Sequence, residues 1–98
     1  MRINTYGTFV LNYNKRIYNL KFGANLICVQ NNKLYIDKTI IGSDCSFVIN
    51  IEDESASLIK LDDNITDLDF QGNIARLKDN VCFSINNSTI VFYFKYEL

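Results

Sequence analysis

Short apolar runs separated by clusters of asparagine, aspartate, glycine and serine make up most of this sequence, and they limit what it can fold into. In Phe47–Ile51 and Val81–Ile85, apolar side chains occupy every second position. Alternation at a period of two is typical of β-strands, and runs spaced by about eight to twelve residues are typical of an all-β sandwich or barrel. We therefore predict an all-β chain, folded as an antiparallel β-sandwich of about 9–11 short strands.

The expected strands follow from the apolar runs and the turn residues between them. They are Thr8–Asn12, Arg16–Phe22, Leu26–Gln30, Leu34–Asp37, Phe47–Ile51, Ser57–Leu61, Ile65–Phe70, Ile74–Leu77, Val81–Ile85 and Thr89–Tyr96. Asparagine tolerates the left-handed backbone of a tight hairpin turn, so pairs such as Asn31-Asn32 predict hairpins. A single helical turn within Asp62–Leu68 is left open, because Ile65 and Leu68 are three residues apart.

Two strands carry more specific expectations about their faces. In Arg16–Phe22 we expect Ile17, Leu20 and Phe22 to point inward, and Gly23-Ala24-Asn25 to end the strand. The last strand is apolar on both faces over Ile90–Phe94. That pattern predicts a central strand, or one whose outer side is covered by a partner.

Size and charge exclude several classes of partner. With 98 residues the chain is expected to form one domain spanning residues 1–98. Ten basic residues stand against 11 acidic ones, and the basic residues are scattered singly, so neither a nucleic-acid partner nor an anionic membrane surface is expected. No window approaches the about 20 apolar residues of a membrane span, so direct membrane insertion is not expected.

Catalytic and metal-binding chemistry is not encoded in a recognisable form. The chain has no histidine, which excludes Ser-His and Cys-His nucleophile pairs and removes the commonest metal ligand. Asp62–Asp69 looks like part of a calcium loop, but Asp67 stands where glycine is needed and Asn73 where a glutamate is needed. The sequence therefore predicts a non-enzyme without metal or cofactor, although a small enzyme or ligand-binding barrel with a deep pocket stays open.

Three cysteines are too few and too widely spaced for the disulfide framework of a small secreted domain, which favours a reduced, cytoplasmic setting. Cys28 and Cys82 are expected to be small packing residues. Cys45 lies in a predicted turn and is the one expected to react with thiol reagents.

The second half of the chain resembles a forkhead-associated (FHA) domain, a β-sandwich of the FHA/SMAD-like kind. Ile41–Asp44 and then Val48–Asp53 resemble the family's Ile-Gly-Arg followed by an apolar strand and an acidic turn. Ser55–Leu58 falls where the family has Ser-x-x-His. Leu77–Asn86 and Ile90–Phe94 resemble the closing hairpin of the family, with asparagine in the turn glycine positions.

The resemblance implies a binding site on loops. Its residues in this chain would be Gly42, Ser43, Ser55, Ser57, Gln71, Gly72 and Asn73. The family's phosphate-gripping arginine is replaced by Ser43 and its histidine by Leu58, while Ser55 alone matches the phosphate-binding motif in type. A serine hydroxyl lacks the charge to select phosphate over water, so phosphothreonine recognition is expected to be absent.

The resemblance thus implies a non-catalytic module that binds another protein. Degenerate domains of this kind occur as cytosolic scaffold parts of bacterial secretion machines, including the membrane ATPase of type VII secretion, whose opening strands look like Phe9–Arg16. A rival hypothesis is a small phage-encoded inhibitor of a host defence enzyme, suggested by the short length and by a residue usage typical of an AT-rich genome. The sequence indicates neither the partner nor the oligomeric state.

Overall fold

The computed structural model describes residues 7–53 and 55–96, which form ten β-strands and no helix. The strands are β1 (Gly7–Tyr13), β2 (Arg16–Leu20), β3 (Gly23–Gln30), β4 (Lys33–Ile36), β5 (Cys45–Ile51), β6 (Ala56–Lys60), β7 (Ile65–Thr66), β8 (Ile74–Leu77), β9 (Val81–Ile85) and β10 (Ser88–Tyr96). The predicted all-β class and strand number are confirmed. Among the described residues, no helix is long and apolar enough to cross a membrane.

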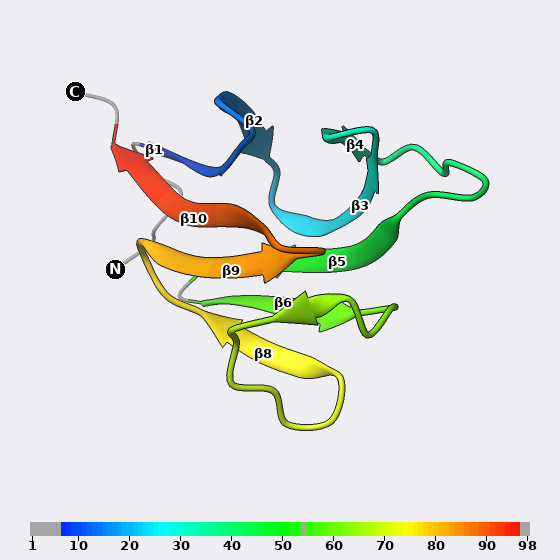
Figure 1. Cartoon of the computed structure of the whole chain (residues 1–98). Helices are drawn as coiled ribbons and strands as arrows, with labels where there is room; N and C mark the ends of the chain where they lie inside the picture. Colours follow the sequence, from blue (N-terminus) through cyan, green and yellow to red (C-terminus); the bar gives the residue numbers. More distant parts are fainter. Residues whose placement is uncertain (1–6, 54, 97–98) are drawn as a thin grey trace.

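The strands form two antiparallel sheets of five strands that face each other (Figure 1). Sheet A has the order β2-β1-β10-β9-β7, and sheet B has the order β4-β3-β5-β6-β8. Alternation places one side chain of every two between the sheets, as in β5, where Cys45, Phe47, Ile49 and Ile51 are buried. This confirms the sandwich predicted from the sequence.

Aromatic side chains join the two sheets and the strands within sheet A. Phe47 of sheet B meets Phe83 of sheet A edge to face, with ring centroids 6.1 Å apart and planes at 86°. Phe9 and Phe92 stack on neighbouring strands of sheet A, with centroids 5.6 Å apart. Such aromatic pairs add to the stabilisation that comes from burying their area.

The central position predicted for the last strand is confirmed, because β10 lies between β1 and β9. Ile90 and Phe92 point into the core, with exposed fractions of 0% and 1%. Val91 and Tyr93 on the other face are half-buried. The side chain of Phe94, also part of the prediction, lies outside the described residues.

The second strand differs from the expectation. Leu20 is buried as predicted, but Ile17 and Phe22 are 56% and 40% exposed, so their inward placement was wrong. Leu20 pairs with Phe9 and Tyr18 with Leu11, which fixes the even positions as the inward ones and turns Ile17 to the outer face. The strand ends at Leu20, so Phe22 lies in the following turn.

Several strand ends differ from the prediction by one or two residues, and two boundaries differ more. β3 begins at Gly23, not at Leu26, and therefore includes Ala24 and Asn25, which were expected to break the chain. β7 contains only Ile65 and Thr66, since Asp67 has a positive φ of 72° that ends the extended backbone. Asp62–Leu68, where a single helical turn was left open, contains a turn at Asp63-Asn64 followed by β7, and none of its residues, all of which the structure describes, is helical.

Candidate functional site

Three hairpins turn through pairs of residues that both have positive φ. The pairs are Asn14-Lys15, Asn31-Asn32 and Asn86-Asn87, with φ between 48° and 69°. They connect β1 to β2, β3 to β4 and β9 to β10, each as a two-residue type I′ turn. The hairpin expected at Asn31-Asn32 is therefore confirmed.

The three turns lie at the same end of the sandwich. In sheet B, Val29 near the end of β3 pairs with Cys45 at the start of β5, and Phe47 pairs with Lys60 at the end of β6. The β4–β5 and β6–β7 loops therefore reach this end as well. We call it the asparagine end and define it by Asn14, Asn31, Asn32, Asp44, Asn64, Asn86 and Asn87.

Hydrogen bonds join the five loops of the asparagine end in a continuous chain. Asn14 Nδ2 donates to the carbonyl oxygen of Asn32 at 3.2 Å, and the backbone N–H of Asn31 donates to Asp44 Oδ2 at 3.3 Å. Asn64 Nδ2 donates to the carbonyl oxygen of Asp44 at 3.0 Å. The backbone N–H of Asn86 donates to the carbonyl oxygen of Asn64 at 3.4 Å. Loops linked in this way are pre-organised, which lowers the entropy cost of binding.

The β6–β7 loop is fixed to sheet B beneath the asparagine end. Asp62 Oδ2 accepts hydrogen bonds from the backbone N–H of Ser46 at 2.7 Å and from Ser46 Oγ at 3.2 Å. Cys45, the residue before Ser46, is fully buried. Burial, together with the nearby charge of Asp62, raises the pKa of its thiol to about 12. A thiol of this kind is neutral at physiological pH and is no nucleophile.

The expectations for the cysteines were therefore wrong in two places. Cys45 was expected in a reactive turn but is the first residue of β5 and points into the core. Cys82 was expected to pack but is exposed on the outer face of sheet A. Cys28 is buried, as predicted.

The β4–β5 loop ends in a fixed turn that presents an apolar side chain. The N–H of Ser43 donates to the carbonyl oxygen of Ile40 at 3.3 Å, and Gly42 has φ of 73°, as in a type II turn. Glycine suits the positive φ at that position. The turn holds Ile41 at its tip, and this side chain is 98% exposed.

The base of the same loop is held by charge. Lys21 Nζ donates a hydrogen bond to Asp37 Oδ2, and the backbone N–H of Leu26 donates to Asp37 Oδ1 at 3.4 Å. The hydrogen bond from Lys21 is the main cause that lowers the pKa of Asp37. The carboxylate is therefore ionised at neutral pH, which keeps both contacts in place.

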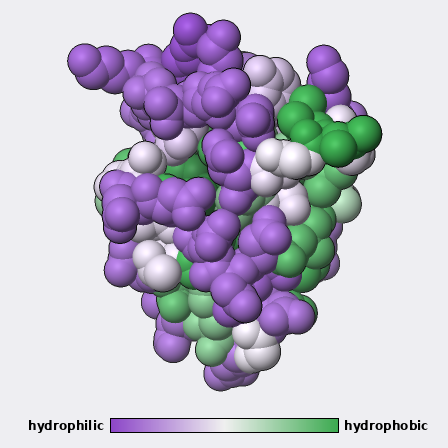
Figure 2. Space-filling model, turned by 45° about the vertical axis from the view of Figure 1, so that its right-hand side comes forward, coloured by the Kyte–Doolittle hydropathy of each residue, from purple (hydrophilic) through white to green (hydrophobic). Residues whose placement is uncertain are grey.

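The charges at and around the asparagine end are mixed. Lys15, Arg16 and Lys33 adjoin the turns of the β2 and β4 side, whereas Asp44 and Asp62 belong to the loops on the other side. Figure 2 turns toward the viewer the end at which β9 ends and β5 begins, and hydrophilic side chains cover most of this face. Hydrophobic side chains gather along its right-hand edge. Such a surface offers hydrogen bonds of both kinds without a strong net field.

The structure distributes the seven residues of the predicted binding site over three places. Gly42 and Ser43 lie in the β4–β5 loop, close in the chain to Asp44 of the asparagine end. Ser55 and Ser57 adjoin Ala56, which pairs with Ile51, and therefore lie at the opposite end of the sandwich.

The remaining three residues form a turn beside the end of β6. The N–H of Lys60 donates to the carbonyl oxygen of Asn73 at 2.8 Å, and Gln71 and Ile74 form an isolated β-bridge. Gly72 has φ of 64°, which suits glycine in the turn. The serine pair is thus far along the strands from the other five residues.

Sequence reasoning located the asparagine turns but did not group them. The sequence does contain a signal for this grouping. Consecutive strands of a hairpin series run in opposite directions, so every second turn lies at the same end of the sandwich. The missing information was which loops run back along a sheet, as the β4–β5 loop does, and this depends on pairings between distant strands.

Among the described residues, no three potential metal ligands come together. No protein-family model and no curated protein matches the sequence. A solved structure described as Rv0020c_FHA matches with a TM-score of 0.63 and 19% sequence identity, over 90% of this chain and 93% of that chain. The matched share includes nearly the whole of both chains, so the likeness concerns the complete sandwich and not one hairpin. The chain has a forkhead-associated (FHA)-like fold.

Proposed function

We propose that this protein is a non-catalytic protein-interaction module of the FHA-like class, which contacts its partner through the asparagine end. The observation that carries the proposal is the chain of hydrogen bonds that joins five loops at one end of the sandwich. Loops on a rigid scaffold are the usual place for binding residues. The amides of this surface pair with the backbone and polar side chains of a protein partner.

Ile41 supplies the apolar part of the contact. It is 98% exposed at the tip of a fixed turn in the β4–β5 loop, which also carries Asp44. Burying such a side chain in a partner contributes about 1.5–3 kcal/mol. The partner accordingly offers an apolar socket surrounded by hydrogen-bonding groups.

Binding by this module does not depend on phosphate. Of the positions that the FHA resemblance assigned, Ser43 and Ser55 carry no charge and lie near opposite ends of the sandwich. Titration with matched phosphothreonine and unmodified peptide libraries is expected to give no phosphate-dependent binding. Phosphate-dependent binding of any peptide would contradict this, and its loss in Lys33→Gln would place the phosphate beside the Asn31-Asn32 turn, which Lys33 adjoins.

The contact surface is tested with the partner captured from the native host and then purified. Ile41→Ser is expected to weaken binding by roughly ten- to a hundredfold. Ile17→Ser is the matched control, because Ile17 is also exposed, at 56%, but lies on the edge strand β2. Equal affinity of wild-type and Ile41→Ser would exclude Ile41 from the contact.

In the cell, we propose a cytoplasmic scaffold role within a bacterial secretion machine. Support comes from the FHA-like fold and from three cysteines that are all unpaired, as expected in a reducing compartment. The partner is then another component of the secretion machine, and the gene of the partner lies close to the gene of this protein. A host nuclease as the partner, or a prophage as the gene's neighbourhood, would instead identify a phage inhibitor.

A further inference from the structure

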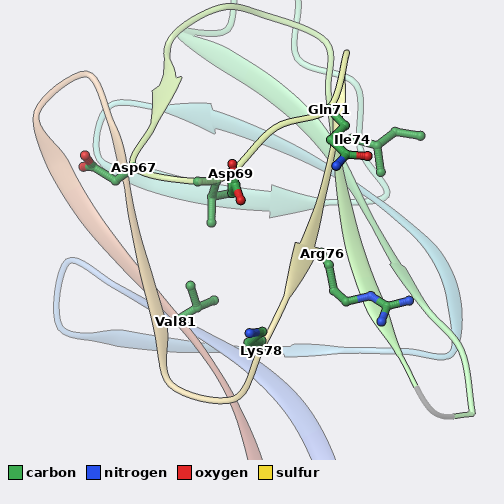
Figure 3. Close-up of a pocket in the computed structure, with 8 residues that line it drawn as sticks. Asp67, Asp69, Gln71, Ile74, Arg76, Lys78 and Val81 are labelled. Atoms are coloured by element: carbon green, nitrogen blue, oxygen red, sulfur yellow. The ribbon is translucent and has the colours of Figure 1, made fainter.

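The lateral opening of the sandwich beside β8 holds a groove that is separate from the asparagine end. It has a volume of about 750 Å³ and lies between the β7–β8 connection, β8 and the start of β9 (Figure 3). Volumes of this size are typical of sites for small ligands or short peptide segments.

The floor of the groove is apolar. Leu68 and Val81 line it, and both are partly buried side chains packed against the core. Figure 3 shows Val81 directed into the opening from β9. An apolar side chain placed here is removed from water on several sides, which stabilises a complex by an amount that grows with its buried area.

Opposite charges face each other across this floor without pairing. Asp69 and Lys78 lie on opposite sides of the opening in Figure 3, while Asp67 and Arg76 point away from each other at its margins. Within the described part of the chain, none of these four residues forms an ion pair. A ligand therefore meets a carboxylate on one wall and an ammonium group on the other.

The wall formed by β8 also offers backbone groups. The N–H of Lys60 donates to the carbonyl oxygen of Asn73. In an antiparallel ladder, hydrogen-bonded and non-hydrogen-bonded residue pairs alternate, so the pair Ser57–Arg76 is a non-hydrogen-bonded one. The N–H and C=O of Arg76 therefore point away from β6. The N–H of Ile74 donates to the carbonyl oxygen of Gln71 at 3.2 Å, and the C=O of Ile74 accepts from the N–H of Gln71 at 2.9 Å. The C=O of Lys78 accepts a hydrogen bond from the N–H of Val81 at 3.1 Å. The backbone of Arg76 is left without a strand partner among the described residues.

We propose that this groove binds an extended peptide segment in which an apolar residue lies between a basic and an acidic residue, each two positions away, so that the three side chains share one face. The apolar side chain rests on Leu68 and Val81, the basic one faces Asp69, and the acidic one faces Lys78. The peptide backbone pairs with Arg76, as in the addition of a strand to a sheet edge. The contact is short, so we expect a dissociation constant on the order of a millimolar.

The test uses three capped pentapeptides, Lys-Ala-Leu-Ala-Glu, Glu-Ala-Leu-Ala-Glu and Lys-Ala-Leu-Ala-Lys, titrated into the ¹⁵N-labelled full chain. Their outer and central side chains share one face of the extended peptide, because only alternate positions point the same way. We expect amide shift changes at 68–71 and 76–81, and tighter binding of the mixed peptide than of the other two. Shift changes elsewhere, none at all, or equal binding of the three peptides would overturn the proposal.

Asp69→Lys makes both walls of the groove cationic and should reverse the preference. The ratio of affinities for the acidic over the mixed peptide is expected to rise about fivefold. Asp63→Lys is the matched control, since its side chain is 97% exposed and does not line the groove. An unchanged ratio in Asp69→Lys refutes the role of Asp69. The outcome is independent of the Ile41→Ser test, because the two surfaces share no residue.

Discussion

Asn25 shows how one polar side chain can fix a turn from within the core. It is fully buried in β3, and all of its hydrogen-bonding groups are used. Its Oδ1 accepts from the N–H of Lys21 at 3.0 Å, and its Nδ2 donates to the carbonyl oxygens of Lys21, Gly23 and Ile49 at 2.9, 3.3 and 3.1 Å. The side chain thus ties the β2–β3 turn to β5.

Replacing Asn25 by leucine is expected to lower the free energy of unfolding by about 2–4 kcal/mol, because buried backbone groups lose their partners. Urea unfolding followed by circular dichroism measures the change. Asn19→Ala, at an exposed position of β2, is the control and should stay within about 0.5 kcal/mol of wild-type. A loss below about 1 kcal/mol in Asn25→Leu would contradict the role given to this side chain.

The three thiols differ in reactivity according to burial. Cys82 is exposed, whereas Cys28 and Cys45 are buried and the pKa of Cys45 is raised to about 12. At about pH 8, a chromogenic disulfide reagent should therefore modify Cys82 alone in the folded protein. Cys82→Ser should leave no fast-reacting thiol, and reaction of this variant without denaturant would show that Cys45 or Cys28 is accessible.

The thiol of Cys45 also contributes to the pH dependence of the free energy of unfolding. The folded-state pKa of Cys45, about 12, lies above the ordinary thiol value of 9.0, so between these pH values the folded protein keeps a proton that the unfolded chain loses. The contribution is fully present below about pH 9 and is lost as the pH rises toward about 12. Cys45→Ala should show a shallower decline in unfolding free energy over that range than wild-type.

At the scale of elements, the hairpin turns depend on residues that accept a left-handed backbone. Asn87 has φ of 69° and is exposed, so the cost of a substitution there reflects the backbone alone. Asn87→Val is expected to destabilise the protein by about 1–2 kcal/mol, and Asn87→Gly to be neutral or slightly stabilising. Melting temperatures of the two variants test this, and equal values would contradict the turn assignment.

The sequence predicts these turns well because their signal is local. An asparagine pair between two apolar runs defines both the turn and the register of its hairpin. The start of β3 was not predictable in the same way. Gly23-Ala24-Asn25 has the composition of a turn that separates two strands, although it forms the first residues of β3. Its extended conformation depends on a hydrogen bond from Asn25 to Ile49, which is distant in the sequence.

For the whole molecule, one buried cluster includes side chains from both sheets, among them Phe47 and Phe83. We therefore predict that the chain unfolds in a single transition, as expected of one domain. Phe83→Ala should lower the unfolding free energy by about 3–5 kcal/mol. Circular dichroism and tyrosine fluorescence should give coincident curves, and two separated transitions would contradict a single domain.

The fold was predictable from the sequence to a greater extent than the site. Alternation in runs such as Val81–Ile85 is enough to indicate a sandwich, since one buried face requires a second layer. The binding residues assigned by resemblance rested on order along the chain. Ser55 and Ser57 follow Ser43 closely in sequence, yet β5 carries the chain to the opposite end between them.

The capped margin of β8 has a consequence for solubility. Sheets aggregate when an open edge strand templates further strands from other copies. Here the bridge between Gln71 and Ile74 closes one end of that margin, and the turn from Lys78 to Val81 closes the other. Of the described backbone along this edge of β8, only the N–H and C=O of Arg76 stay available for pairing with another strand. One residue with a charged side chain is too short a stretch to template fibril growth.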